Sequence, residues 1–369
     1  MRRTILPAFK DARRRLILAL ESSADDTCAA VVSSHREILS NVVLKQNNIH
    51  EQYGGIHPLY AVQGHMMNIP QAINDALRLS NLSLNDMDAI ATTQGPGMPG
   101  CLQIAIVAAK ALAGVSNKPL IGVHHMQAHA LTCTLTEKTP PEFPFYTLLC
   151  SGGHTMIVDS ESVDKMSILA TSHDDSIGNA FDQAAKLLNI PWSLHPSNAP
   201  GAALEVFADQ DNIKANEGAL IKEYRKKLRV PAPGQLLFSY SGLRSAFGRL
   251  VVESDKTETT RKALARAFQA AAVAQLRDKQ KQIELALDKA PAKPSSLVVS
   301  GGVASNGYLR KSLTELTERQ NMNIYFPAPS LCTDNAAMIA WAAHYKLANE
   351  DFSNPCTLMS RPKWSLEEL

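Results

Sequence analysis

Two stretches of the chain share one pattern: a short apolar strand, a polar turn and a second short strand. The first copy predicts strands at 16–20 and 28–32, and the second predicts strands at 146–149 and 155–159. Mixed strand and helix patterns follow each copy, as expected for an α/β fold made by duplication. Residue identity between the halves is slight, so the duplication is one of architecture.

The length of 369 residues predicts two lobes rather than one core. Pro140, Pro141 and Pro144 interrupt the pattern and mark the expected change of lobe. We therefore expect a basic leader at 1–15, a first lobe at 16–144 and a second lobe at 145–333. A C-terminal helix and tail at 334–369 are expected to return to the first lobe.

Charge is nearly balanced, with a net value of +2, which neither requires nor excludes a nucleic-acid partner. Ten basic residues gather in one part of the second lobe, where a solvated helical surface and a phosphate-binding face both remain open; they are Lys222, Arg225, Lys226, Lys227, Arg229, Arg244, Arg249, Arg261, Lys262 and Arg266. The Arg-rich, acid-poor leader predicts mitochondrial targeting, with an ordinary basic terminus as the alternative.

The six cysteines are scattered and form no CxxC pair, which favours a reducing compartment. No apolar run reaches the roughly 20 residues that span a bilayer, so no membrane partner is expected.

A predicted helix after the strand at 120–123 carries His125 and His129, four residues apart and therefore on one face. Two such imidazoles can hold a metal ion, although many pairs at this spacing are ordinary helix histidines. A protease of the HExxH type needs a glutamate beside the first histidine, and here Met126 stands there. Asp334, at the start of the last predicted helix, is a candidate third ligand, with helix capping as the alternative.

Three glycine turns can bring backbone amides close to a phosphate: Gly95-Pro96-Gly97, Ser151-Gly152-Gly153 and Gly301-Gly302. Two of them follow apolar strands of the second lobe, as a nucleotide cleft would require, although a plain turn is the commoner role of any single pair. Neither of these two second-lobe turns fits GxGxxG or GxxxxGK[ST], so dinucleotide-binding and P-loop sites are not expected there.

Several strings, in order from about Leu16 to Trp364, resemble the TsaD/OSGEP family of tRNA threonylcarbamoyl-adenosine transferases, in the superfamily of actin, sugar kinases and heat-shock ATPases. The strings are Leu20-Glu21-Ser22-Ser23, Asp25-Asp26-Thr27, Gly95-Pro96-Gly97, His124-His125-Met126-Gln127-Ala128-His129, Ser151-Gly152-Gly153-His154-Thr155, Ala180-Phe181-Asp182, Phe238-Ser239-Tyr240-Ser241-Gly242-Leu243, Ser300-Gly301-Gly302-Val303-Ala304-Ser305-Asn306 and Cys332-Thr333-Asp334-Asn335. The resemblance implies a duplicated actin-like fold, similar to ribonuclease H, with two lobes and a central cleft.

The resemblance also implies the site. His125, His129 and Asp334 would be metal ligands; Leu149, Cys150, Ser151, Gly152, Gly153, Asp182, Gly201 and Asn306 would line the donor. A helix-terminal role is the alternative for both Asp182 and Asn306. The chain departs from the family at Ala24, Cys101, Asn179 and the segment 192–200, in a way that resembles the organellar branch.

The implied reaction transfers threonylcarbamoyl from threonylcarbamoyl-AMP to the exocyclic amine of the adenosine immediately 3′ of the anticodon. The acceptors would be tRNAs that read ANN codons, and AMP would leave. One divalent metal is expected, Zn²⁺ or Fe²⁺ with Mg²⁺ as an alternative. Asp25 or Asp26 would assist proton transfer. A YrdC-like synthase would supply the donor, and the enzyme would act as a homodimer in the mitochondrial matrix.

Two alternative functions remain open. An ATP-dependent small-molecule kinase of the same superfamily usually has Asp-x-Gly-Thr in its first phosphate turn, whereas Glu21 to Thr27 contains no glycine. A non-catalytic binding scaffold is the third possibility, and such proteins are expected to lose metal ligands.

Overall fold

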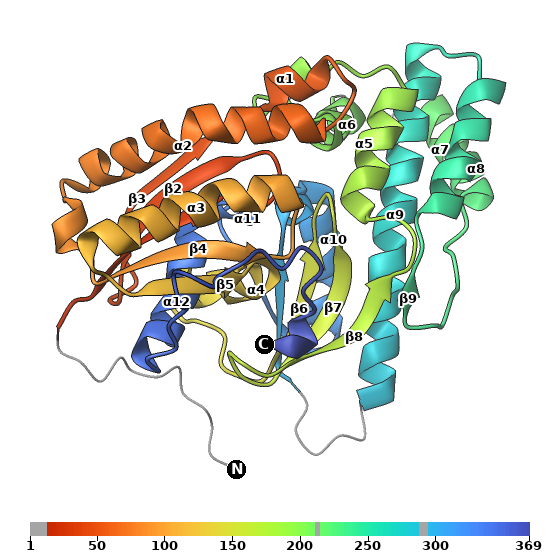
Figure 1. Ribbon diagram of the computed structural model, residues 1–369. Helices are drawn as coiled ribbons and strands as arrows, with labels where there is room; N and C mark the ends of the chain where they lie inside the picture. Colours follow the sequence, from red (N-terminus) through yellow and green to blue (C-terminus); the bar gives the residue numbers. More distant parts are fainter. Residues whose placement is uncertain (1–12, 211–214, 288–293) are drawn as a thin grey trace. The chain divides into compact units, whose positions relative to one another are not determined.

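The computed structural model describes residues 13–210, 215–287 and 294–369, and these form two compact units (Figure 1). Unit 1 contains the chain up to Phe143, the hairpin Ser160–Ser167 and the C-terminal segment Pro327–Leu369. Unit 2 contains Pro144–Asp159 and Ile168–Phe326. Of the leader expected at 1–15, residues 1–12 lie outside the described part.

Unit 1 is built on a five-stranded sheet with the order β3-β2-β1-β4-β5. β1 pairs antiparallel with β2, which pairs antiparallel with β3, whereas β1, β4 and β5 run parallel. The strands are β1 (Leu16–Glu21), β2 (Thr27–Ser33), β3 (Ile38–Leu44), β4 (Ala89–Gly95) and β5 (Leu120–His124). β1 and β2 are buried almost throughout, which explains their nearly continuous apolar sequences.

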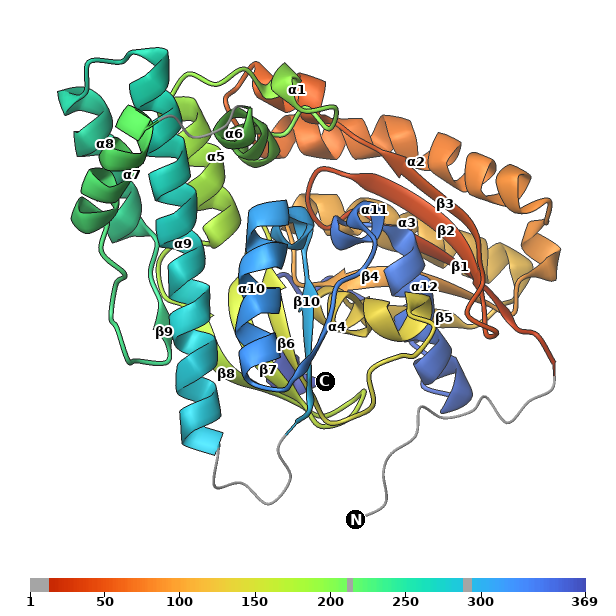
Figure 2. The ribbon, with the colours of Figure 1, turned by 180° about the vertical axis from the view of Figure 1, so that it is seen from behind.

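Helices cover both faces of this sheet: α2 and α3 lie over one face, and α12 and α4 lie on the other (Figures 1 and 2). The helices of unit 1 are α1 (Asn47–Glu51), α2 (Pro58–Ser80), α3 (Pro99–Ser116), α4 (His125–Thr136), α11 (Pro329–Cys332) and α12 (Ala336–Ala348), with 3-10 turns at Leu84–Asp86 and Leu366–Glu368. α12 packs against all five strands of this sheet and against α4, so it is apolar on nearly every side.

By length and hydropathy alone, α3 could cross a membrane. Its buried residues include Leu102, Ala105 and Ile106, and they belong to the apolar core that also contains Leu18 and Ile90 of the sheet. One face of α3 therefore packs into the core of unit 1, while residues such as Val107 and Val115 are exposed.

Unit 2 repeats the topology of unit 1. Its six-stranded sheet has the order β11-β10-β6-β7-β8-β9, so β8-β7-β6-β10-β11 corresponds to β3-β2-β1-β4-β5. β6, β10 and β11 run parallel, as β1, β4 and β5 do. The strands are β6 (Phe145–Cys150), β7 (Thr155–Ser160), β8 (Met166–Ser172), β9 (Leu237–Phe238), β10 (Ser296–Ser300) and β11 (Asn323–Tyr325). The predicted α/β duplication is confirmed.

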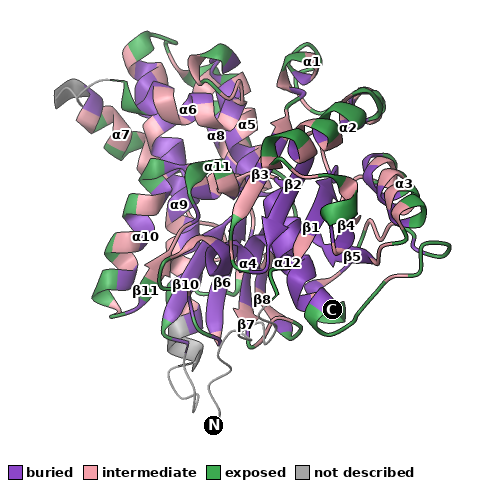
Figure 3. Cartoon of the chain, turned by 90° about the vertical axis from the view of Figure 1, so that its left-hand side faces the viewer, coloured by how far each residue is buried: buried purple, intermediate pink, exposed green. Residues whose placement is uncertain are grey.

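The helices of unit 2 form a layer around α9, which contacts α5, α6, α7, α8 and α10. They are α5 (Ile177–Leu187), α6 (Pro200–Asp209), α7 (Ala215–Lys227), α8 (Ser241–Glu253), α9 (Glu258–Leu287) and α10 (Gly307–Arg319), with 3-10 turns at Trp192–Leu194 and Gly302–Ser305. In each unit the central strands are the most buried part, as the purple β1, β2, β6 and β10 show (Figure 3). Both candidate sites lie where such strands end.

Candidate metal centre and glycine turn

His125, His129 and Asp334 come together in unit 1, with one potential ligand atom from each within 4.8 Å of the others. Asp334 Oδ1 lies 3.4 Å from Nε2 of His125 and 3.1 Å from Nε2 of His129. Both histidine side chains are nearly fully buried, whereas 24% of the Asp334 side chain is exposed. The group therefore has two buried imidazoles and one carboxylate that reaches the surface.

The start of α4 fixes the two imidazoles. β5 runs directly into α4, and His124 is the N-cap: its Nδ1 accepts hydrogen bonds from the backbone N–H groups of Met126 and Gln127 at 3.2 and 3.3 Å. The other ring nitrogen of His124 is 3.1 Å from the carbonyl oxygen of Trp364, which makes Nε2 the donor. A third histidine thus serves as a helix cap.

Asp334 does not cap α12. The N-cap is its neighbour Asn335, whose side-chain oxygen accepts from the N–H of Met338 at 3.0 Å. This arrangement leaves the carboxylate of Asp334 available to the histidines. Because α12 packs against α4, the two helix starts bring the three side chains together.

The donor set suits a divalent metal. Two imidazole nitrogens and one carboxylate oxygen are the ligands that zinc and iron sites use in proteins. Metal–ligand bonds of about 2.0–2.1 Å place tetrahedral ligands about 3.3 Å apart. The observed separations of 3.4 and 3.1 Å match that spacing.

A further carboxylate stands behind His125. Nδ1 of His125 lies 3.1 Å from Glu21 Oε2 and 3.3 Å from the hydroxyl of Ser23. Burial opposes protonation of His125, but the carboxylates of Asp334 and Glu21 outweigh it and raise its pKa to about 10. Burial alone would raise the pKa of Asp334, but the two imidazoles hold it below its ordinary value. In the metal-free protein, His125 is therefore protonated, and its positive charge lies between the carboxylates of Asp334 and Glu21.

The turn between β1 and β2 carries Asp25 and Asp26. Burial, followed by the charge of Asp334, raises the pKa of Asp25 to about 6. Burial together with Asp25 and Asp334 raises the pKa of Asp26 well above its usual range. His65 of α2 holds this turn, since its ring nitrogens lie 3.0 Å from the carbonyl of Ala24 and 2.8 Å from the hydroxyl of Thr27.

The loop Gly95-Pro96-Gly97 packs against the same turn. A Cβ atom on Gly97 would lie 2.7 Å from the carbonyl oxygen of Ser23, and the N–H of Met98 donates to that oxygen at 2.8 Å. Glycine at 97 is therefore required by close backbone approach.

The turn Ser151-Gly152-Gly153-His154 joins β6 to β7 in unit 2. It is fixed against the start of α5: the hydroxyl of Ser176 donates to the carbonyl of Gly152 at 2.5 Å, and the N–H of Gly178 donates to that of Ser151 at 3.2 Å. A Cβ atom on Gly178 would lie 2.4 Å from the oxygen of Ser151. The turn and the helix therefore form one rigid joint.

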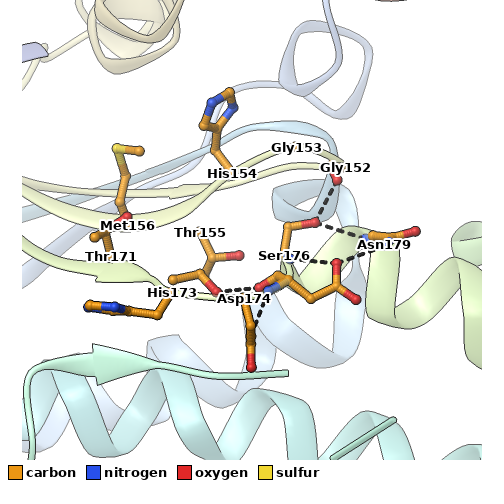
Figure 4. A pocket seen from close by; sticks show the side chains of 12 residues that line it. Gly152, Gly153, His154, Thr155, Met156, Thr171, His173, Asp174, Ser176 and Asn179 are labelled. Atoms are coloured by element: carbon orange, nitrogen blue, oxygen red, sulfur yellow. Dashed lines mark hydrogen bonds between the residues drawn. The ribbon is translucent and has the colours of Figure 1, made fainter. Parts of the chain in front are cut away.

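Gly152 and Gly153 differ from Gly178, because nothing lies within 4 Å of a Cβ atom built on either. Both are exposed. Packing therefore does not require glycine at these two positions, which leaves room for a ligand to approach the backbone. They border a cavity of about 220 Å³ (Figure 4). Its lining also includes His154, Met156, Asp174 and Asp175.

The acids of this cavity are engaged by the protein. Asp174 accepts hydrogen bonds from the hydroxyls of Ser239 and Ser241 and from the N–H of Tyr240, which fixes the start of α8. Burial opposes ionisation of Asp174, but these bonds outweigh it and lower its pKa to about 2. Asp175 is paired with Arg244 at 3.1 Å. Because both carboxylates bind residues of the segment 239–244, they connect this segment to the cavity wall and do not form a cation site.

The other expected donor-binding residues fall into three local settings. Leu149 and Cys150 are fully buried at the end of β6, so only their backbone can face a ligand. Asp182 Oδ1 accepts from the N–H of Gly201 at 2.8 Å, which brings these two together. Asn306 caps α10 by accepting from the N–H of Leu309 at 2.8 Å.

Several residues of the basic group of unit 2 have partners within the protein. Lys262 pairs with Glu258, Arg244 with Asp175 and Arg266 with Glu217, while Arg261 donates to the carbonyl of Leu188. These contacts favour a structural role for these four residues. Lys227 pairs with Glu223 at the surface, where both side chains are more than half exposed.

Known proteins resemble this chain over most of its length. A family model described as TsaD, tRNA N6-adenosine threonylcarbamoyltransferase, matches residues 37–341. The chain belongs to the TsaD family. It is 36% identical to a probable mitochondrial tRNA N6-adenosine threonylcarbamoyltransferase of Arabidopsis thaliana, over 98% of this chain and 76% of the relative. The same identity relates it to the tRNA N6-adenosine threonylcarbamoyltransferase of Rickettsia bellii, over 96% of this chain and 99% of the relative.

Solved structures share the fold of this TsaD family member at low identity. HypF of T. kodakarensis matches with a TM-score of 0.55 and 14% identity, over 94% of this chain and 49% of that protein. Component A of the Acidaminococcus fermentans (R)-2-hydroxyglutaryl-CoA dehydratase matches with a TM-score of 0.50 and 13% identity, over 91% of this chain and 99% of that protein. The expected actin-like fold class is confirmed.

Sequence reasoning missed the residues behind the metal group. Glu21, Ser23 and Thr93 contact His125 or one another, yet only the first two lay in a string that was singled out, and neither had a role. A signal was present: a glutamate that ends an otherwise apolar buried strand needs a partner of opposite charge or a hydrogen-bond donor. The identity of that partner depends on the fold.

Proposed function

We propose that this chain transfers the threonylcarbamoyl group from threonylcarbamoyl-AMP to the exocyclic amine of the adenosine immediately 3′ of the anticodon, in tRNAs that read ANN codons. The observation that carries the proposal is the convergence of His125, His129 and Asp334, in a member of the TsaD family. In this reaction a C–N bond forms to the carbamoyl carbon, the bond from that carbon to the AMP oxygen breaks, and the amine loses a proton.

His125, His129 and Asp334 would hold one divalent ion, Zn²⁺ or Fe²⁺, with Mg²⁺ as the alternative. When bound, the ion supplies Lewis-acid stabilisation of negative charge. Asp334, with part of its side chain exposed, is the ligand nearest to solvent and so to an incoming substrate.

Asp25 or Asp26 would accept the amine proton, because both carboxylates belong to the turn that His65 fixes beside the metal group. Asp25→Asn or Asp26→Asn should therefore lower kcat while leaving the metal content at the wild-type level. Unchanged kcat in both variants would exclude this role.

The backbone around Gly152 and Gly153 would contact the adenylate, with Asp182, Gly201 and Asn306 completing the donor site of unit 2. Support comes from the open space at both glycines, which the fold itself leaves unused. Asp182 would accept hydrogen bonds from the ribose hydroxyls.

The expected setting of the enzyme belongs to the same proposal. A YrdC-like synthase makes the adenylate, two copies of the chain form a homodimer, and the leader directs the protein to the mitochondrial matrix. The domain limits at 15, 144 and 333 are proposed as folding boundaries. Similarity to the plant mitochondrial relative supports the location, and exposed Met66 and Met67 on α2 offer apolar area to a second copy. Sedimentation of the purified chain tests the dimer, and protease protection in isolated mitochondria tests the matrix.

The test of the activity is direct. Purified protein is incubated with threonylcarbamoyl-AMP and unmodified tRNA, and the digested tRNA is analysed for threonylcarbamoyl-adenosine by mass spectrometry. A His125→Ala/His129→Ala variant is run in parallel, with His35→Ala as the control because His35 is an exposed residue outside the site. Product from the wild type and the control but not from the double variant supports the proposal. No product from wild-type protein that contains metal and binds the adenylate would contradict it for the isolated chain.

A further inference from the structure

Glu21 is the last residue of β1 and its side chain is fully buried. One carboxylate oxygen, Oε1, accepts the N–H of Ser23, and the other, Oε2, accepts the hydroxyl of Thr93. Oε2 also lies 3.1 Å from Nδ1 of His125. Both oxygens of Glu21 thus accept hydrogen bonds from N–H or O–H donors, so the carboxylate faces Nδ1 of His125 as an acceptor.

An acceptor at this place determines which nitrogen of His125 carries hydrogen. Nδ1 of His125 must therefore be the donor toward Glu21. This leaves Nε2, which lies on the side of Asp334, to offer its lone pair to a metal ion. The neighbour His129 has no such support: among the described residues, no hydrogen-bond partner faces its buried Nδ1. The two imidazoles are therefore supported unequally.

We infer that Glu21 is the positioning residue of the metal centre: it fixes the tautomer and ring orientation of His125 so that Nε2 can bind a divalent ion. This inference rests on the proposed function, because it assumes the metal group. Carboxylates that accept from the second nitrogen of a metal-bound histidine raise the basicity of the ligand and hold its ring, and their loss typically costs about 10–100-fold in metal affinity.

The variant Glu21→Gln tests this with almost no change of shape. Its amide has one acceptor and one donor end, whereas Ser23 N–H, Thr93 O–H and His125 Nδ1–H all need an acceptor. If the amide oxygen remains on Ser23, the NH₂ group faces His125 and favours hydrogen on Nε2. If the amide turns over, two N–H groups oppose each other at Ser23.

The experiment measures zinc affinity of the full chain by competition with a chromophoric chelator, together with the visible spectrum of the Co²⁺-loaded protein. The matched control is Glu217→Gln, which also removes the charge of a buried carboxylate but whose partner is Arg266 in unit 2. Thermal unfolding of each metal-free variant reports on structural damage separately.

Glu21→Gln should bind zinc about 10–100-fold more weakly than the wild type and change the Co²⁺ spectrum, while Glu217→Gln keeps the wild-type affinity. Equal affinity and an unchanged spectrum in Glu21→Gln would overturn the inference while leaving the metal centre intact. Equal weakening in both variants would also overturn it, because loss of stability would then be the cause. Wild-type protein that binds no metal would remove the centre itself, and this role of Glu21 with it.

Discussion

The metal group of unit 1 and the glycine turn of unit 2 keep their shapes by different means. In the metal group, buried ionisable side chains hold one another, so each position depends on the charge of its neighbours. In the glycine turn, backbone carbonyls and amides hold the geometry, and the two central glycines have no neighbour to fill the space beside them. Substitutions that change the charge of a side chain should therefore disturb the metal group most. Substitutions that add side-chain volume or alter the backbone should disturb the glycine turn most.

The largest expected effect is the removal of one charge from the metal group. Asp334→Asn keeps the shape of the side chain but loses the carboxylate that lies within 3.4 Å of both imidazoles. Loss of the metal removes several kcal/mol of charge stabilisation, so kcat/KM should fall by more than about 100-fold. Metal content and product formation are measured together, with exposed Asp351→Asn as the control.

A pair of alanine substitutions separates the two kinds of glycine in unit 2. Gly178→Ala places a Cβ atom 2.4 Å from the carbonyl of Ser151 and should destabilise the protein by about 1–3 kcal/mol. Gly152→Ala meets open space, so its unfolding midpoint should stay near that of the wild type while KM for the adenylate rises. Both are followed by thermal unfolding and steady-state kinetics. An equal loss of stability in Gly178→Ala and Gly152→Ala would contradict the difference in packing between these two glycines.

Removing charge from the turn of unit 1 should stabilise the metal-free protein. The carboxyl of Asp25 has an ordinary pKa of 3.8, and the fold raises it to about 6. The folded state is thus weakened as the pH rises from about 4 to 6, and the full penalty persists above 6. Asp25→Asn should add about 3 kcal/mol at pH 8 and less than about 1 kcal/mol at pH 4, as denaturant titrations at the two pH values would reveal. If Asp25→Asn stabilised the protein more at pH 4 than at pH 8, the pKa of Asp25 would not be raised by the fold.

The smallest effect is expected at an exposed ion pair in the basic region. Lys227 lies 2.7 Å from Glu223, but both side chains are more than half exposed. Lys227→Ala should change the free energy of unfolding by less than about 0.5 kcal/mol, because water already solvates both charges. A change above about 1 kcal/mol in the free energy of unfolding, measured by chemical denaturation, would show that Lys227 stabilises the fold more than an exposed ion pair does.

The sequence predicted the architecture well because its signals are local. The apolar runs at 16–20 and 146–149 form strands, and the paired strand–turn–strand openings predicted the duplicated topology. The short β9 strand, Leu237–Phe238, was not predicted, since two residues give no period to read.

The candidate site was only partly predictable. The spacing of His125 and His129 placed both on one helix face. Asp334 was a candidate third ligand from its place at the start of the last predicted helix, and the family strings supported it. Pattern alone could not show that Asn335 rather than Asp334 caps α12, because either residue can cap a helix. Nor could it reveal the contact between Glu21 and His125, which joins residues 104 positions apart through the pairing of strands and the packing of α4.

The most direct test of the metal centre follows metal and product in one preparation. The wild-type chain is assayed for bound divalent metal and for threonylcarbamoyl-adenosine in tRNA, then stripped with a chelator, assayed again, and reloaded with Zn²⁺ or Fe²⁺. The account predicts about one metal ion per chain, loss of product on stripping and recovery on reloading. Full product formation by the metal-free protein would contradict it.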